Sequence, residues 1–193
     1  MTASTTRCCR RRSWFPALAA LWMFLAAPVP AHADGIEVRK AALVAAEDRY
    51  FLEAEFDISL THTLEDALNK GVPLHFLLEF ELIRPRWYWF NERVANTQQH
   101  YRLAYNALTR QYRVAIGTLY QNFGTLAEAL AFLSRVRVRE IAEPGVVRKD
   151  VSYTAAVRMR LDSSQLPRPF QVSAVGSREW SVSSEWHRWT VSP

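Results

Sequence analysis

Two acidic stretches are the first candidates for chemistry, because their polar side chains alternate with apolar ones. The first stretch contains Glu53, Glu55 and Asp57, and the second contains His75, Glu79 and Glu81. On extended strands, each set shares one face. If the two strands were neighbours, the oxygens and the imidazole could bind a metal. Two carboxylates about 5–10 Å apart could also act as the acid and base of a glycoside hydrolase.

A solvated sheet face with cross-strand ion pairs is the alternative interpretation of the same carboxylates. Suitable arginines alternate along two later stretches, at Arg135, Arg137, Arg139, Arg158 and Arg160. Opposite charges that face each other across neighbouring strands stabilise a sheet. The pattern favours these ion pairs, and we expect neither a metal nor a cofactor.

Residues 84–90, which read RPRWYWF, are the second candidate. Four consecutive aromatic residues could form the core of a two-sided strand or an exposed binding surface. On a strand, Trp87 and Trp89 share one face, and Tyr88 and Phe90 share the other. The two arginines have the parity of Tyr88 and Phe90 and avoid burial, so we expect the tryptophans in the core.

The candidate binding patch therefore consists of Arg84, Arg86, Tyr88, Phe90 and Arg93. Aromatic and arginine side chains are favoured at binding hot spots, so this patch could hold a peptide, a sugar or a lipid headgroup. Strand core remains the alternative interpretation of the whole aromatic run.

Common catalytic signatures are missing from the sequence. It contains neither Gly-x-Ser-x-Gly nor His-Glu-x-x-His, and its six glycines do not cluster into a phosphate-binding loop. The pattern favours a non-enzymatic protein, with a hydrolase that uses the outer-face carboxylates as the alternative.

The N-terminus has the three parts of a secretory signal peptide. Arginines at 7, 10, 11 and 12 precede an apolar run over residues 14–27, and Ala31, His32 and Ala33 form a small-x-small cleavage site. The apolar run is shorter than the roughly 20 residues that a spanning helix needs. We therefore expect cleavage after Ala33 and a periplasmic location for residues 34–193.

Charge and cysteine content change when this leader is removed. The leader holds four of the 24 basic residues, none of the 19 acidic residues, and both cysteines, Cys8 and Cys9. The remaining 160 residues are almost neutral, whereas nucleic-acid-binding proteins carry a basic surface. We expect no nucleic-acid partner, and a domain that is stabilised by its core without disulfides.

Period-two alternation predicts a single antiparallel, mainly β (α+β) domain over residues 34–193. The expected strands cover residues 36–46, 49–60, 72–83, 135–141 and 150–162, with a hairpin over 101–120. Two short helices are expected. The first covers residues 64–70 after the capping residue Thr63, and Gly71 is expected to end it. The second lies in the segment 124–134 and is capped by Thr125 with Glu128. Residues 163–170 are expected to form a loop.

A shift of 62 residues aligns the two halves of the chain, because TLEDAL at 63–68 falls on TLAEAL at 125–130. The coincidence is compatible with a duplicated strand-strand-helix-strand unit. With or without duplication, the expected architecture is an antiparallel β-sandwich or flattened barrel with two short helices.

Several segments resemble an uncharacterised family of exported Gram-negative proteins, domain of unknown function 4390. They read RPRWYWFNERV, YRLAYNALTRQYRV, TLAEALAFL, LPRPFQV and EWSVSSEW. The resemblance covers nearly all of the chain after the leader, and it implies export but no catalytic residues. We therefore expect a binding or interaction module of the cell envelope. Its partner is an unidentified envelope protein or peptide, with peripheral membrane contact as an alternative.

Overall fold

The computed structural model describes residues 35–46, 49–88, 90–139, 141, 147–148, 150–174 and 176–192. Residues 33–193 group as one compact unit. The expected leader, residues 1–33, and the turn at residues 47–48 lie outside the described residues. Cleavage after Ala33 therefore stays a prediction.

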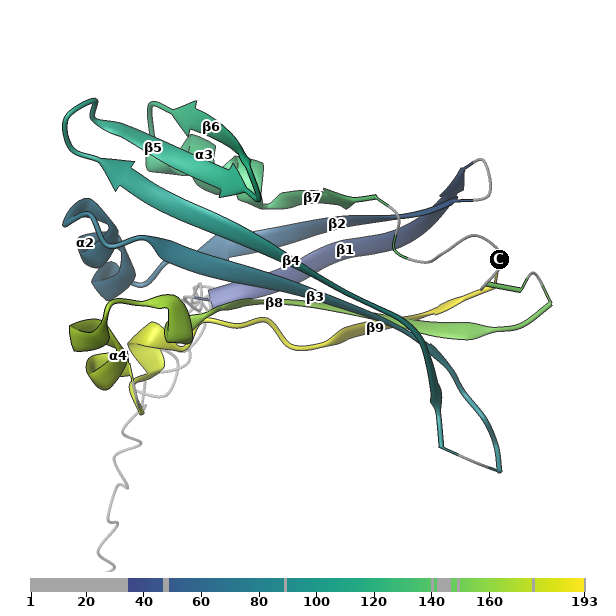
Figure 1. Cartoon of the computed structure of the whole chain (residues 1–193). Coiled ribbons are helices and arrows are strands. Elements are labelled where there is room, and N and C mark those ends of the chain that lie inside the picture. The colour runs from purple at the N-terminus through teal and green to yellow at the C-terminus, as the bar shows by residue number, and fades with distance from the viewer. Residues whose placement is uncertain are drawn as a thin grey trace, which may run out of the picture. The chain divides into compact units, whose positions relative to one another are not determined.

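The described residues contain nine strands in two antiparallel sheets (Figure 1). The smaller sheet has the order β1-β2-β7, with β1 at Gly35–Ala46, β2 at Arg49–Ser59 and β7 at Arg135–Val138. The larger sheet has the order β6-β5-β4-β3-β8-β9. Its strands are β3 (Leu74–Arg84), β4 (Glu92–Asn106), β5 (Gln111–Ile116), β6 (Leu119–Phe123), β8 (Tyr153–Leu161) and β9 (His187–Val191).

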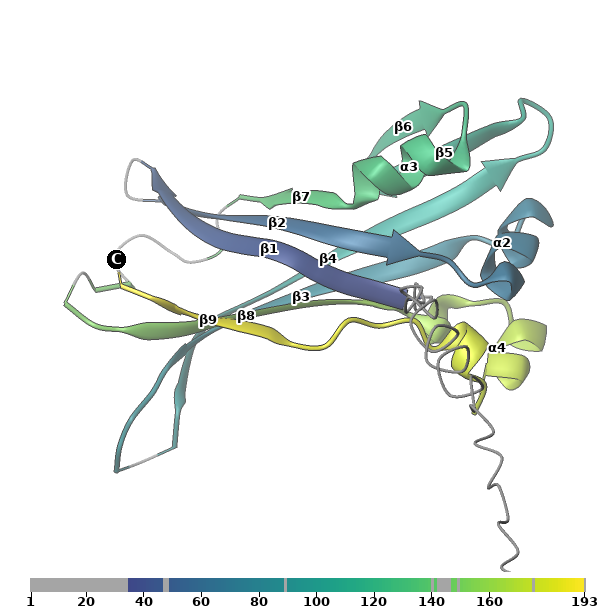
Figure 2. The ribbon, with the colours of Figure 1, turned by 180° about the vertical axis from the view of Figure 1, so that it is seen from behind.

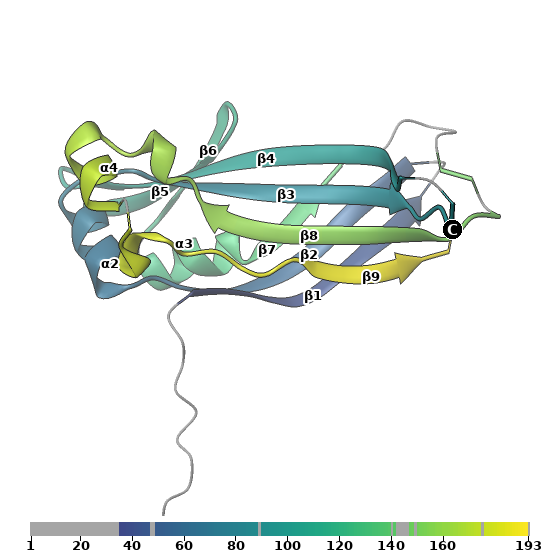
Figure 3. The same cartoon turned by 90° about the horizontal axis from the view of Figure 1, so that it is seen from below.

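The predicted mainly β, antiparallel fold is confirmed, with the two sheets as separate layers. Figure 3 shows the strands of the smaller sheet crossing those of the larger sheet at an angle. The flattened barrel is the wrong one of the two expected forms, because no described strand joins the sheets into a closed ring.

The core lies where the apolar faces of both sheets meet. In β3, every second residue from Leu74 to Leu82 is at most 1% exposed. The matching face of β2 contributes Leu52, Ala54 and Phe56 to the same cluster of buried residues. This is the alternation expected from the sequence, because successive side chains on a strand point to opposite faces.

The outer face of β3 is covered as well in the middle of the strand. Leu77 and Glu79 lie on this face and are only 4% and 8% exposed. On this face Glu79 pairs with Arg158 and Arg160 of β8, and the Arg158 guanidinium lies over the Trp186 ring, 4.6 Å from its centroid. Two-sided burial of a strand, which the sequence analysis assigned to residues 87–90, therefore occurs in β3.

Helix α2 (His62–Asn69) begins two residues before the expected start. Thr61, not Thr63, is the N-cap, and its hydroxyl accepts a hydrogen bond from the Leu64 amide (3.3 Å). Thr63 instead donates its hydroxyl to the Glu179 carboxylate (2.7 Å), a partner far away in the sequence. Gly71 ends the helix as predicted: it adopts φ 86°, and the Val72 amide bonds back to the Ala67 carbonyl (3.0 Å).

Helix α3 (Leu126–Leu133) confirms the predicted capping box. The Glu128 amide donates to the Thr125 hydroxyl (3.2 Å), and the Thr125 amide donates to the Glu128 carboxylate (3.4 Å). The pair satisfies two amides that the first helical turn otherwise leaves without a partner. Ala129 and Leu133 then face the core.

We expect Thr125→Ala to lower the free energy of unfolding by about 1 kcal/mol, because the Glu128 amide loses its acceptor. Thr118→Ala, in the exposed turn between β5 and β6, is the matched control and should change stability by less than about 0.5 kcal/mol. Urea unfolding of both variants measures the difference. Equal losses would show that the capping box does not stabilise this helix.

The expected loop over residues 163–170 is only partly a loop. Residues Ser163–Gln165 form the short 3₁₀ helix η1, and helix α4 covers Arg168–Ala174. Pro167 lies just before this helix, and Pro169 lies within its first turn. Proline is tolerated there because the first amides of a helix have no partner within it.

Among the described residues, no helix is both long and apolar enough to cross a bilayer.

The two halves related by the 62-residue shift share one strand pair and differ in the other. The hairpin β1–β2 in the smaller sheet has its counterpart in the hairpin β4–β5 of the larger sheet. The second partner of β2 is β7, whereas the second partner of β5 is β6. The two halves therefore share their pairing pattern only in part.

Candidate functional site

The long hairpin formed by β3 and β4 ends in a loop that contains the aromatic run. Arg84 and Glu92 are the last paired residues of the hairpin, and residues 85–91 connect them. Pro85 follows β3 directly, and its nitrogen has no hydrogen to donate to a sheet. The Arg86 amide donates to the Asn91 side-chain oxygen (3.4 Å) across the base of the loop. We call residues 84–93 the hairpin tip.

A β-bulge lies directly below the hairpin tip. Leu82 pairs with Ala95, whereas the next residue, Ile83, pairs with Arg93, so Val94 is the additional residue in β4. A bulge bends the strand that carries it and increases the local twist. Figures 1 and 2 show the hairpin bending away from its neighbours at this end, with helices α2 and α4 at the opposite end of the strands.

Large aromatic side chains of the tip are exposed to an unusual degree. Trp87 is 93% exposed, Tyr88 is 70% exposed and Phe90 is 87% exposed. The Trp87 and Tyr88 rings pack edge to face, with their centroids 5.0 Å apart. Edge-to-face packing is a preferred geometry of aromatic pairs, and both rings remain largely accessible to a partner.

The expectation of a two-sided strand with Trp87 in the core is wrong. Alternation assigns faces only while the chain remains in a sheet, and Pro85 takes the chain out of the sheet. Trp87 is instead the most exposed of the three described aromatic residues of the tip, while Tyr88 and Phe90 are exposed as predicted. Trp89 lies outside the described residues. The missed signal was the pair of turn-forming residues, Pro85 and Asn91, that flank the aromatic run.

Ion pairs hold the base of the hairpin tip. Arg84 and Arg86 both donate to the same Oε2 atom of Glu92, and the Arg86 contact measures 2.6 Å. Arg93 lies 3.4 Å from Glu81. The hydrogen bond from Arg86, with that from Arg84, holds the pKa of the Glu92 carboxyl below its ordinary value, despite opposing desolvation. The Glu92 carboxyl is therefore ionised at neutral pH. Together with Glu81, the lower part of the hairpin tip carries three arginines and two glutamates.

The structure thus brings the predicted patch residues together on one element. Arg84, Arg86 and Arg93 lie at the base of the tip, and Tyr88 and Phe90 lie in the loop above. Sequence reasoning missed Trp87 as a surface residue. It also missed Glu81 and Glu92 as partners of the arginines.

The two acidic stretches of the sequence do not meet. Glu53, Glu55 and Asp57 lie on β2 in the smaller sheet, whereas His75, Glu79 and Glu81 lie on β3 in the larger sheet. In the part of the chain that the structure describes, no three His, Cys, Asp or Glu residues form a group that could hold a metal ion.

Among the arginines expected to pair with the acidic strands, Arg137, Arg158 and Arg160 do so, and Arg39 and Arg93 are further partners that were not expected. The pairs are Glu53 with Arg137, Glu79 with Arg158 and Arg160, Glu81 with Arg93, and Asp57 with Arg39. Burial of Glu79 favours its neutral form, but the hydrogen bond and charge of Arg158, together with Arg160, outweigh this effect and lower its pKa. A general acid for glycoside cleavage needs a raised pKa, so Glu79 is poorly suited to that role.

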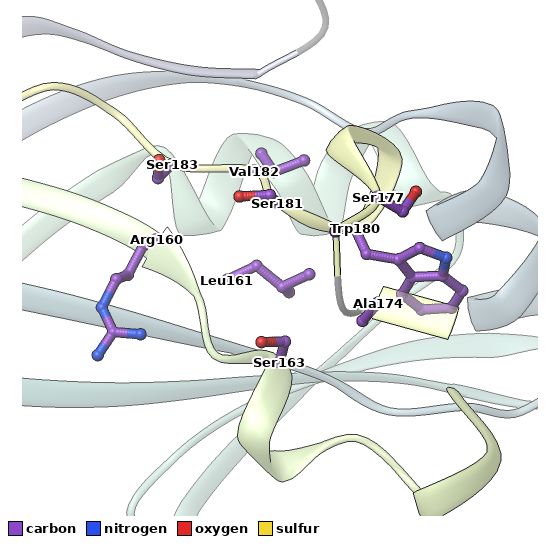
Figure 4. Close-up of a pocket in the computed structure, with 10 residues that line it drawn as sticks. Arg160, Leu161, Ser163, Ala174, Ser177, Trp180, Ser181, Val182 and Ser183 are labelled. Atoms are coloured by element: carbon purple, nitrogen blue, oxygen red, sulfur yellow. The ribbon is translucent and has the colours of Figure 1, made fainter. Parts of the chain in front are cut away.

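A pocket between β8, α4 and η2 (Arg178–Trp180) is the second candidate site (Figure 4). It has a volume of about 430 Å³, and its lining includes Ser163, Ser177, Ser181 and Ser183. No histidine or carboxylate is among the residues that line it, so these hydroxyls have no general base there. Arg160 points away from Ser177 and Trp180 in Figure 4 and pairs with Glu79 (3.4 Å).

Comparison with known proteins gives a family match. The family model described as Domain of unknown function (DUF4390) matches residues 33–190. No curated protein and no solved structure matches the chain. The match confirms the family resemblance seen in the sequence segments and covers both sheets of the structure. The chain therefore belongs to the DUF4390 family.

Proposed function

We propose that the protein is an exported, periplasmic binding module of the cell envelope that docks on its partner through the hairpin tip. The observation that carries the proposal is the exposure of Trp87, Tyr88 and Phe90 in one loop, at 93%, 70% and 87%. Single exposed apolar residues are normal on protein surfaces, but a contiguous group of them marks an interaction site.

The arrangement of side chains at the tip supports a binding role. The three described aromatic side chains lie outside the core cluster, so they can contact a partner without any change in the packing of the core. Ion pairs at Arg84, Arg86 and Glu92 hold the loop at its base. Holding a loop in place before binding lowers the entropy lost on association.

Export rests on the leader pattern of residues 1–33, which is a property of the sequence alone. A periplasmic hydrolase remains the alternative function, but two observations weigh against it. Four of the acidic residues on the outer faces, Glu53, Asp57, Glu79 and Glu81, pair with arginines. The described residues that line the serine-rich pocket include no general base.

Photo-crosslinking in cells that express the full chain tests the binding role. A photoreactive benzoylphenylalanine replaces Phe90 in one variant and Tyr120 in the control, because Tyr120 is also exposed (64%) but lies in β6, outside the tip. We expect adducts at position 90 that are absent at position 120. Adding Trp87→Ala and Tyr88→Ala to the Phe90 variant should remove most of these adducts.

Mass spectrometry identifies each adduct, and cell fractionation locates the protein. Equal adduct yields at positions 90 and 120 would contradict a docking role for the tip. Recovery of the chain in the cytoplasm with residues 1–33 intact would contradict the proposed export.

A further inference from the structure

We infer that the partner of the hairpin tip is the surface of a phospholipid bilayer, into which the aromatic side chains insert. This inference rests on the proposed function, because it names the partner of the same tip. It follows from the size of the tip, the identity of its aromatic residues, the position of its charges and its orientation.

The tip is small and convex. Its loop has seven residues, 85–91, between the last paired residues of the hairpin. A stable protein interface uses roughly 20–30 residues on each side, and its hot spots lie in packed pockets. A bilayer needs no such complementary surface, because lipid molecules rearrange around an inserted side chain.

The aromatic residues are those that membrane interfaces favour. Tryptophan and tyrosine concentrate at the level of the lipid headgroups, where an apolar ring meets lipid and a polar atom meets water. Trp87 and Tyr88 pack edge to face in the loop, and Phe90 adds a purely apolar ring. The exposed aromatic residues therefore combine apolar rings with polar atoms, as residues at the membrane–water interface do.

The arginines lie at the depth where phosphates would be. The centre of the loop, near Tyr88, is at most four residues beyond Arg84, or about 13 Å along an extended chain. Peripheral segments bury their apolar groups by roughly 5–10 Å into the headgroup and acyl boundary. At such a depth the guanidinium groups of Arg84, Arg86 and Arg93 reach the headgroup layer.

Charge at the tip is complementary to a lipid surface. Each carboxylate at the base has an arginine partner: Glu92 pairs with Arg84 and Arg86, and Glu81 pairs with Arg93. Three arginines against two glutamates leave a net positive charge. Arg93 is the most accessible of the three, with 60% of its side chain exposed, so it can contact an anionic headgroup.

The orientation of the hairpin completes the case. The bulge at Val94 bends the tip away from the neighbouring strands, as both views in Figures 1 and 2 show. A flat surface that approaches along the bent end of the hairpin meets the aromatic loop before the adjacent strands (Figures 1 and 2). Insertion therefore requires no opening of either sheet.

Vesicle flotation with residues 34–193 tests the inference without interference from the apolar leader. These residues hold the complete described core, from Ile36 to Val182, and lie within one compact unit. The probes are vesicles of phosphatidylcholine alone and vesicles that also contain anionic phosphatidylglycerol. We expect binding to both, with higher affinity for the anionic vesicles.

Matched variants locate the binding to the tip. The triple variant Trp87→Ala, Tyr88→Ala, Phe90→Ala should lose at least about tenfold in vesicle affinity. The control Leu119→Ala, Tyr120→Ala removes two exposed apolar residues of β6 and should change the affinity less than about twofold. Arg93→Gln should weaken binding about fivefold on anionic vesicles only.

Fluorescence measures insertion directly. Lipids with brominated acyl chains should quench part of the tryptophan emission of the bound protein, and Trp87→Phe should reduce that part while binding persists. Absence of vesicle binding, or equal binding by the triple variant, would overturn the inference. In that case protein adducts at position 90 in the crosslinking experiment would retain the proposed docking role, and their absence would remove both.

Discussion

Replacing Phe80 with alanine is expected to lower the free energy of unfolding by about 3–5 kcal/mol, whereas Phe90→Ala should change it by less than about 0.5 kcal/mol. Both substitutions remove the same side chain from the same hairpin. Phe80 is 1% exposed, lies in the middle of β3 and contacts Trp189 of β9, with ring centroids 6.3 Å apart. Phe90 lies at the tip and is 87% exposed.

The difference arises from the cavity that the mutation leaves. Removing Phe80 opens a space between two sheets that cannot close completely, so transfer energy and packing are both lost. A loss of this size is a large part of the roughly 5–15 kcal/mol that stabilises a typical domain. Denaturant unfolding of the two variants measures it. Similar losses for both would show that the tip packs against the body of the protein.

Glu79→Gln is expected to cost about 2 kcal/mol at neutral pH, because it removes the carboxylate that Arg158 and Arg160 share on the buried outer face of β3. The Glu79 side chain is 11% exposed, so its loss leaves two cations beside a covered site. Water limits the cost, since about a third of each arginine side chain is exposed: 32% for Arg158 and 35% for Arg160.

This cost should depend on pH in one direction. Despite the opposing effect of burial, the two arginines hold the pKa of Glu79 in the folded protein below its ordinary value. In acid the unfolded chain therefore binds the proton first, and protonation favours unfolding. The stabilising contribution is complete above the ordinary glutamate pKa of about 4.3 and disappears as the pH falls through the lower folded value.

Unfolding curves of the wild type and Glu79→Gln between neutral and acidic pH measure this dependence. The two stabilities should converge as the pH falls. Glu81→Gln is the matched control on the same face of β3, and its partner Arg93 is 60% exposed, so its cost should stay below about 1 kcal/mol. A constant difference between Glu79→Gln and wild type at every pH would exclude ionisation of Glu79 as the cause.

The sequence by itself determined the features that depend on near neighbours in the chain. Alternation identified the buried face of β3, because side chains on a strand point to opposite faces with period two. The capping box of α3 was readable because Thr125 and Glu128 are three residues apart and bond to each other. The same periodicity identified Arg137, Arg158 and Arg160 as partners of the acidic strands, but it did not identify Arg39 or Arg93.

The candidate site was predictable in composition but not in position. Arg84, Arg86, Tyr88, Phe90 and Arg93 were identified from their residue types, and the structure places all five on one hairpin tip. The exposure of Trp87 was not predictable from alternation, because it depends on where the β3–β4 pairing ends. That end is set by Pro85 and by the pairing of Arg84 with Glu92.

Only the tertiary structure decided the features that involve distant partners. At the start of helix α2, the Thr61 and Thr63 hydroxyls donate hydrogen bonds to Glu179, which lies more than a hundred residues later in the sequence. The division into two sheets places β2 and β3 in different layers and so separates the two acidic stretches. The direction of the tip depends on the bulge at Val94. Val94 is an additional residue only because Leu82 and Ile83 of β3 pair with Ala95 and Arg93 on either side of it. Strand pairing and register depend on interactions between segments that are distant in the sequence, so no single segment determines them.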